Sequence, residues 1–389
     1  MRAESSFPPL GRESFLGRDE RRIEAFGDGT PAKLRARAAL KLAEELLLLR
    51  VHGSRSPRGW IALHHALSLP FKLRARRRRC IAWAGAEAVG VECVGPPKRF
   101  EALLERLFER RGPWLRGSRT GTWRPRSPRP SGGHRMPAAE AGLRDGGATE
   151  RPADLVAIDV HRWMAAAFRR KGWLLVPSAV RWVGELSRLP PTQKSHSLRE
   201  DLRASRLAGY SLEEGSSDGD WREFFEGMVL PHARRRFERR AWLASPRLRR
   251  DLAARARLLF VRHEGRRVAG ECVVARGPVL WSPLLGIRDG DPELLRRGAV
   301  AALYGLVFVW ARENGFRTVD QGRTSPFLRD GLVRYKRKWG LDPIADPLAH
   351  LVALRVNPRS EPLAAAFARE PLLVESGRAL EPFAGTVLA

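Results

Sequence analysis

Residues 319–340 bring an acid, an arginine and a lysine into one short stretch of sequence. An apolar residue precedes Asp320, which places this carboxylate at the end of a predicted strand. Gly322 permits a turn or the close approach of a ligand, and Arg323 and Thr324 follow as hydrogen-bond donors. Because a carboxylate can take up a proton and an arginine can hold a phosphate, this turn is suited to bind an anionic ligand beside a reacting group.

A basic, aromatic helix is predicted directly after this turn. Tyr335, Lys336 and Trp339 recur at a spacing that places them on related faces of a helix. A lysine so placed can bind a phosphate or stabilise a developing oxyanion, and the tyrosine hydroxyl could donate a proton. A structural interpretation also fits, in which Asp320 and Arg323 form a fixed ion pair while the two rings fill the core.

The elements that must position these residues are predicted from residue 153 onward. Helical and alternating apolar patterns follow one another, which indicates an α/β fold with a mixed, mostly antiparallel sheet flanked by helices. Strands are predicted at residues 155–160, 173–176, 209–214, 258–263, 268–275, 279–285, 318–321 and 350–356. Helices are predicted at residues 162–171, 178–189, 194–208, 220–238, 291–314 and 327–339.

The rest of the chain is predicted to form three further regions. Residues 1–111 form an N-terminal α/β region, in which helices are predicted at 33–50, 60–73 and 100–111 and one or two strands within 80–94. Residues 112–152 are rich in proline, glycine and arginine, which is typical of a linker. A gap of that length is unusual inside one compact domain, so we expect a boundary there. Residues 357–389 are expected to form a C-terminal tail.

Composition limits the class of protein. Hydrophobic residues make up 43% of the 389 residues, which supports a globular core. No apolar run reaches the roughly 20 residues that a membrane helix needs, and residues 1–22 lack the apolar stretch of a signal peptide. Cys80, Cys93 and Cys272 are widely spaced and indicate buried thiols in a reducing compartment. We therefore expect a cytoplasmic protein. The histidines lack the spacing of metal ligands, so no metal site is predicted.

The net charge of +28 admits two explanations. Only eight of the 71 basic residues are lysines, and alanine and glycine are abundant, so the arginines are consistent with a coding sequence rich in G and C. On this explanation the charges line solvated helix faces. The alternative is an anionic partner, which could be RNA, a nucleotide or a phospholipid surface.

The order of a strand, Asp-x-Gly-Arg, a loop and Gly-Leu-x-x-Tyr-Lys-x-x-Trp-Gly resembles the C-terminal signature of GNAT-like acyltransferases of the FemAB, BioF2 and CelD type. Residues 197–210, 221–236 and 267–270 resemble upstream segments of these proteins in the same order. The resemblance covers about residues 153–356 and implies a GNAT-like fold. The N-terminal region is then either unidentified or a degenerate first lobe of a two-lobed arrangement.

The resemblance implies transfer of an acyl or aminoacyl group to an amine or hydroxyl. The donor would be acyl-CoA or aminoacyl-tRNA as a co-substrate, with no tightly bound cofactor. The acceptor would be a small molecule or a precursor in cell-envelope or polysaccharide metabolism. On this interpretation the catalytic residues are Asp320, Lys336 and Tyr335, and the substrate-binding residues are Arg323, Thr324, Arg236, His232 and Trp339.

One departure from the family pattern concerns the donor. Acetyl-CoA is usually held by a glycine-rich loop before a helix, whose backbone N–H groups bind the diphosphate. The matching segment, residues 286–293, offers Arg288 and Gly290 as cofactor-binding candidates, but their spacing differs from the usual motif and two aspartates would repel a diphosphate. Ordinary acetyl-CoA binding is thereby called into question.

Two alternatives follow from this departure. The first is an aminoacyl-tRNA-dependent transferase, in which the arginines of residues 199–206 and 234–240 contact tRNA. The second is a catalytically inactive GNAT-like module that binds RNA or another partner.

Overall fold

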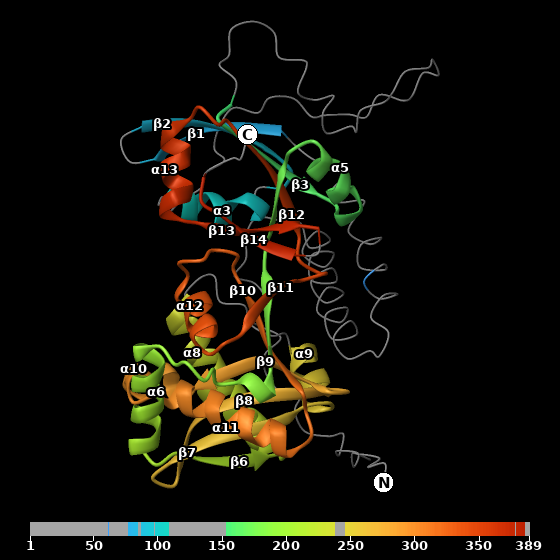
Figure 1. Cartoon of the computed structure of the whole chain (residues 1–389). Coiled ribbons are helices and arrows are strands. Elements are labelled where there is room, and N and C mark those ends of the chain that lie inside the picture. Colours follow the sequence, from blue (N-terminus) through green and yellow to red (C-terminus); the bar gives the residue numbers. More distant parts are fainter. Residues whose placement is uncertain are drawn as a thin grey trace, which may run out of the picture. The chain divides into compact units, whose positions relative to one another are not determined.

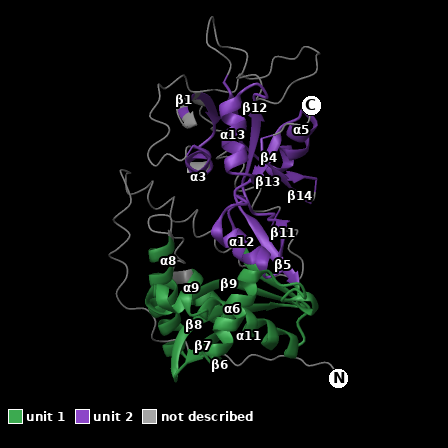
Figure 2. Cartoon of the chain, turned by 60° about the vertical axis from the view of Figure 1, so that its left-hand side comes forward, with its two compact units in different colours: residues 1–57, 185–322 green, residues 58–184, 323–389 purple. Residues whose placement is uncertain are grey.

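The structure is a computed structural model that describes residues 61, 77–84, 87–96, 98–108, 153–237, 246–377 and 379–385 (Figure 1). The predicted helix at 33–50, most of that at 60–73, and the predicted linker at 112–152 lie outside these residues. The chain divides into two compact units, each built from discontinuous stretches (Figure 2). Unit 1 comprises residues 1–57 and 185–322, and unit 2 comprises residues 58–184 and 323–389.

Unit 1 holds a sheet in the order β10-β9-β8-β7-β6 (Figure 1). Neighbouring strands are antiparallel except β9 and β10, which are parallel and joined through α11. The strands are β6 (Ser211–Gly215), β7 (Arg257–His263), β8 (Arg266–Arg276), β9 (Val279–Ile287) and β10 (Thr318–Thr324), whose last two residues belong to unit 2. The helices are η3 (Leu186–Arg188), α6 (His196–Leu207), α7 (Asp218–Arg222), the π-helix η4 (Glu223–Val229), α8 (Leu230–Phe237), α9 (Pro246–Ala253), η6 (Arg288–Gly290), α10 (Pro292–Arg296) and α11 (Ala299–Glu313).

Helices cover both faces of this sheet. Aromatic residues of α7 and η4, including Phe224, pack with Leu258 and Phe260 of β7 in one buried cluster. Successive side chains of a strand point to opposite faces, so Leu259 and Val261 face the other side, where α11 contacts the sheet. All four β7 residues are fully buried, and burial of this kind is the main source of stability for the sheet.

Unit 2 holds a five-stranded sheet in the order β1-β2-β3-β12-β4, together with the pairs β5–β11 and β13–β14. Its strands are β1 (Arg77–Ala84), β2 (Glu87–Val94), β3 (Leu155–Val160), β4 (Leu174–Pro177), β5 (Val180–Glu185), β11 (Asp342–Ala345), β12 (Leu351–Val356), β13 (Leu372–Ser376) and β14 (Ala379–Phe383). Its helices are α3 (Lys98–Leu107), η2 (Arg162–Met164), α5 (Ala165–Arg170), α12 (Gly331–Lys338) and α13 (Glu361–Arg369).

The central strand β3 of this sheet is buried on both faces, as its apolar run from Leu155 to Ile158 indicates. Leu155 and Ala157 join the core formed with α3 and α13, whereas Val156 and Ile158 join the core formed with α5. Both units also share one arrangement, a hairpin followed by a helix and a parallel strand. It is β1-β2-α3-β3 in unit 2 and β8-β9-α11-β10 in unit 1, which fits two lobes of related design.

The expected α/β class, with a mixed, mostly antiparallel sheet flanked by helices, is confirmed. One predicted element is wrong, because residues 178–189 form β5 and the short η3 rather than a helix. Val180 and Trp182 are buried while the residues after them are partly exposed, a period of two that belongs to a strand. The predicted helix at 291–314 is divided into α10 and α11 at Gly298, where φ is +81°.

Residues after 356 contribute regular structure to unit 2. Helix α13 and strands β13 and β14 lie within the stretch predicted as a tail, and Phe367 and Phe383 pack in the unit's core with rings 5.0 Å apart. The compact units therefore do not follow the order of the regions predicted along the sequence. In the described ranges, no helix combines the length and the apolar character needed to cross a membrane.

Candidate active site

The parallel ladder between β9 and β10 is short. It covers three residue pairs and ends at Asp320 and Trp281, although β9 continues to Ile287. We call the four buried residues Ser282, Asp320, Gln321 and Gly322 the β9–β10 fork. The base of the fork is the point where the ladder ends, at Asp320 and Trp281. After this point, the edge of β9 that faces β10 forms no ladder with β10, and the backbone groups of such an edge can hydrogen-bond to an extended ligand.

Close backbone approach defines the base of the fork. Gly322 has a φ of +72°, and an added Cβ would lie 3.2 Å from the Ser282 carbonyl oxygen. Gln321 Nε2 donates a hydrogen bond to Ser282 Oγ at 3.4 Å. A side chain at position 322 would therefore be strained by its backbone conformation and crowded by β9.

Asp320 is fully buried at this point. Its Oδ1 accepts a hydrogen bond from the Gly322 N–H at 3.0 Å, and Arg276 Nη1 lies 3.7 Å from Oδ2. The Arg276 guanidinium stacks on the Trp281 ring, 4.0 Å from its centroid. The carboxylate that was predicted to be catalytic is thus fixed by the backbone and by a cation.

Arg323 and Thr324 lie at the end of β10 that belongs to unit 2. Arg323 pairs with the buried carboxylate of Asp346, whose other oxygen accepts the Leu348 N–H at 2.9 Å. Thr324 Oγ1 accepts a hydrogen bond from Trp182 Nε1 at 2.7 Å and donates one to the backbone. Both predicted substrate-binding side chains therefore have protein partners in this state.

The predicted residues of the basic helix lie on α12, also in unit 2. Asp330 caps the helix by accepting the Leu332 N–H at 2.8 Å. Lys336 is 3% exposed and Trp339 is fully buried, and the Tyr335 ring lies 6.4 Å from that of Trp339. Because Lys336 belongs to unit 2 and Asp320 to unit 1, their joint catalytic role stays a prediction.

In unit 1 the structure brings His232 to the loop that contains Gly290. Gly290 has a φ of +62°, and an added Cβ would lie 3.2 Å from the backbone nitrogen of His232. Burial and the positive charge of Arg236 lower the pKa of His232 to about 4, so this imidazole is neutral at pH 7. Arg236 itself is exposed on α8.

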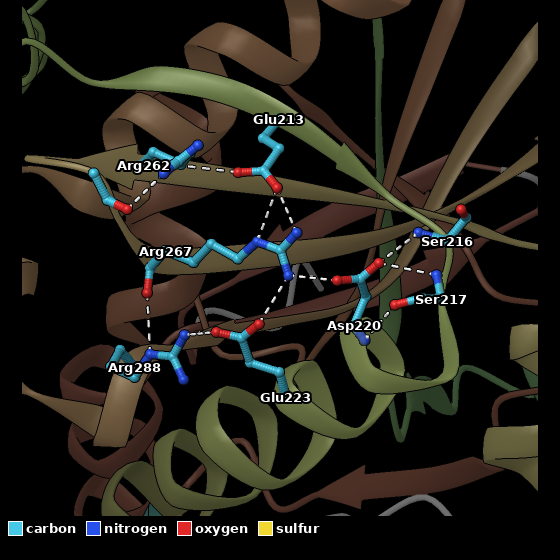
Figure 3. Close-up of polar contacts among 9 residues, drawn as sticks. Glu213, Ser216, Ser217, Asp220, Glu223, Arg262, Arg267 and Arg288 are labelled. Atoms are coloured by element: carbon cyan, nitrogen blue, oxygen red, sulfur yellow. Dashed lines mark hydrogen bonds and ion pairs between the residues drawn. The ribbon is translucent and has the colours of Figure 1, made fainter.

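A network of charged residues connects this loop to the edge of the sheet (Figure 3). The Arg267 guanidinium contacts Glu213, Asp220 at 2.5 Å and Glu223 at 2.8 Å, and Arg288 pairs with Glu223 as well. Burial acts to raise the pKa of Asp220, but hydrogen bonds from Arg267 and from the start of α7 outweigh it and lower that pKa to about 2. We call these five residues the Arg267 network.

An open cleft of about 740 Å³ in unit 1 adjoins the Arg267 network. It is lined by Glu213, Glu223, Arg262, His263, Glu264, Gly265, Arg266, Arg267, Val268, Arg288, Asp289 and Leu294. Sequence reasoning missed the carboxylates of the network, because Glu213, Asp220 and Glu223 stand 44 to 54 residues from Arg267. The pairing of β6, β7 and β8 brings Glu213 to Arg267, and α7 and η4 supply Asp220 and Glu223.

Comparison with known proteins gives one family match and several similar solved structures. Residues 193–337 match the family described as acetyltransferase (GNAT) domain. Similar solved structures include L-PGS from Bacillus licheniformis, with 14% identity over 74% of this chain and 83% of that chain and a TM-score of 0.35. FemX has 11% identity over 75% of this chain and 95% of that chain, with a TM-score of 0.35.

A GCN5-related N-acetyltransferase from Sphaerobacter thermophilus has 18% identity over 51% of this chain and 58% of that chain, with a TM-score of 0.30. Among curated proteins, no sequence matches this chain. The family match spans α6 through most of α12 and includes the fork and the Arg267 network. Residues 193–337 are therefore similar to the acetyltransferase (GNAT) domain family, and the chain has a GNAT-like fold.

Proposed function

We propose that this domain transfers an acyl or aminoacyl group from an activated donor to an amine or hydroxyl acceptor. The observation that carries the proposal is the β9–β10 fork, which lies inside the segment that matches the acetyltransferase family. An extended donor arm can lie along the free edge of β9 and hydrogen-bond to its backbone, as an added strand does. Its carbonyl carbon would then reach the buried polar groups at the base of the fork.

The reaction needs few protein groups beyond correct positioning. The acceptor nitrogen or oxygen attacks the donor carbonyl carbon, a C–N or C–O bond forms, and the C–S or C–O bond to the leaving group breaks. The acceptor loses one proton and the leaving thiol or hydroxyl gains one. We assign the proton transfer to Asp320 and the stabilisation of negative charge to Lys336, with Tyr335 as an alternative proton donor.

The donor is acyl-CoA or aminoacyl-tRNA on this proposal. Exposed arginines favour the second donor, because helices bearing them can contact the phosphates of RNA. They are Arg199, Arg203 and Arg206 on α6 and Arg234, Arg235 and Arg236 on α8. The acceptor class, a small molecule or an envelope or polysaccharide precursor, and the cytoplasmic location rest on the family resemblance and on composition.

A transfer assay with both donors tests the proposal. We expect acyl or aminoacyl transfer by the full chain, and a loss of about 10²–10⁴-fold in kcat for Asp320→Asn, the range of a lost proton-transfer group. Asp342→Asn, on an exposed residue of β11, should keep the wild-type rate.

The outcomes are separable. Full activity of folded Asp320→Asn would remove Asp320 from the mechanism. Transfer with neither donor, while the protein remains folded, would favour the inactive binding module over an enzyme.

A further inference from the structure

The loop between β9 and α10 is held tightly against the preceding helices. An added Cβ at Gly286 would lie 2.5 Å from backbone atoms of Met228 and Val229, and one at Gly290 would lie 3.0 Å from the Pro231 carbonyl oxygen. Backbone therefore packs on backbone at Gly286, near the end of β9, and at Gly290 in the loop, with no room for a side chain at either position. A phosphate group cannot enter between this loop and η4–α8 unless the loop moves away.

Other parts of the protein occupy the N-termini of the helices beyond the loop: Asp291 caps α10, and α6 packs against the start of α11. Anions commonly bind at such termini, where backbone N–H groups lack partners. At α10, the Asp291 side chain accepts the Glu293 N–H at 2.8 Å and so brings its own negative charge to this position. At α11, an added Cβ on Gly298 would lie 3.2 Å from the Ser205 nitrogen and 3.3 Å from the Asp201 carbonyl oxygen, so α6 abuts the start of that helix.

Arg288, the cation of this loop, is engaged by the π-helix η4 (Figure 3). Its Nη2 donates to Glu223, and its Nε donates to the Arg267 carbonyl oxygen at 3.0 Å. A Cβ added at Gly227 would lie only 2.8 Å from Arg288 Nη1, so the guanidinium packs against the space that a side chain at position 227 would fill. Three features of η4 and β8 therefore fix the side chain, and π-helical turns are often found at functional sites.

Glu223 also contacts Arg267 and carries negative charge at neutral pH. Burial acts to raise the pKa of Glu223, but hydrogen bonds from Arg288 and Arg267 outweigh it and leave that pKa below its ordinary value. A diphosphate that approached Arg288 would have to displace this carboxylate, with Asp289 exposed beside it. The loop thus offers an arginine whose charge is already balanced.

We propose that Glu223 is a specificity-determining residue that withholds Arg288 from a donor's diphosphate. The diphosphate of a coenzyme A donor is then not held at the β9–α10 loop, and the anionic part of the true donor is recognised elsewhere on the protein. The inference rests on the proposed function only in assuming that this domain binds a transfer donor.

Calorimetric titration with coenzyme A tests this inference, and inorganic diphosphate serves as a second probe without the pantetheine arm. Glu223→Gln keeps the shape of the side chain and removes its charge. We expect it to bind coenzyme A at least tenfold more tightly than the wild type, which corresponds to about 1.4 kcal/mol. Glu226→Gln, three residues later on an exposed position of η4, should match the wild type.

The double variant Glu223→Gln/Arg288→Gln should return to the wild-type affinity, because the gain requires the released arginine. Equal affinity of folded Glu223→Gln and the wild type would overturn the inference. If Glu223→Gln does not fold, Arg288→Gln alone decides, since we expect it to leave coenzyme A affinity unchanged and a tenfold loss would overturn the inference. These readouts measure binding, so a failure to detect acyl transfer with any donor leaves them unaffected.

Discussion

Arg267 illustrates how a single side chain can fix a site in this protein. It contacts carboxylates from β6, α7 and η4, and its carbonyl oxygen accepts a hydrogen bond from Arg288. Charge-assisted hydrogen bonds of this kind are stronger than neutral ones, and a connected set gives geometric precision. The network therefore holds the start of α7, the π-helix and the β9–α10 loop in one arrangement.

The Asp220 carboxylate gives this network a measurable dependence on pH. Its pKa is about 2 in the folded protein against 3.8 in an unfolded chain, so its stabilising effect is complete above pH 4 and is lost as pH falls through 2. Asp220→Asn should lower the free energy of unfolding at pH 7 by about 1.5 kcal/mol, the lower end for losing a hydrogen bond to a charged group. Urea denaturation should show this difference shrinking between pH 4 and pH 2.

Asp218→Asn is the control, because Asp218 lies exposed in the same helical turn. A difference between Asp220→Asn and the wild type that stays constant down to pH 2 would contradict the assignment of the titration to Asp220.

At the scale of single residues, the sequence predicted some positions well and others not at all. Asp320 was correctly placed in a strand, because an apolar residue before polar residues is a local signal, but the strand does not end there: β10 continues through Gly322 to Thr324. The partner of Arg323 was not predictable in this way. Asp346 lies 23 residues further along the chain, and the folding of the chain brings it to Arg323 rather than a regular spacing within one helix or strand.

At the scale of elements, the conformation of Gly322 determines whether the fork can form. Gly322→Ala places a Cβ in a left-handed backbone conformation and 3.2 Å from the Ser282 carbonyl oxygen. We expect a loss of about 1–2 kcal/mol from the conformation alone, a further loss from crowding, and reduced transfer. Chemical denaturation and the transfer assay measure these effects.

Gly265→Ala separates conformation from crowding. Gly265 has a similar φ of +77° in the β7–β8 turn, and an added Cβ there would meet no atom within 4 Å. It should therefore show the conformational loss alone. Equal losses in the two variants would mean that close approach to β9 does not constrain the fork.

The prediction of helices and strands succeeded where apolar residues recurred with a single helical or strand period. Helix α6, the β7–β8 hairpin and β12 were located to within a few residues, since each shows a single apolar pattern between clear turn residues. β5 was missed because Pro177 suggested the start of a helix at residue 178, whereas the structure buries Val180 and Trp182 alternately, as in a strand. Tertiary packing overrides a local start signal in such cases.

At the scale of the whole molecule, strand order could not be predicted from the sequence. β12 pairs with both β3 and β4, although it begins at Leu351 and these strands end at Val160 and Pro177. Such pairing depends on which apolar faces meet in the folded state, and no local pattern specifies it. The same holds for the discontinuous units, each of which combines residues from distant parts of the chain.

The net charge of +28 leads to a prediction about tRNA binding by the whole chain. If α8 contacts tRNA, Arg234→Gln/Arg235→Gln should weaken binding and reduce the slope of log affinity against log salt by about 1–2, since each lost phosphate contact contributes roughly 0.7–0.9. Filter binding across a series of salt concentrations measures this slope. Arg250→Gln/Arg255→Gln removes the same charge from exposed positions at α9 and just after it, and should change the slope less. Equal changes in both double variants would show that tRNA senses only the overall charge, and the arginines of α8 would then have no special part in donor binding.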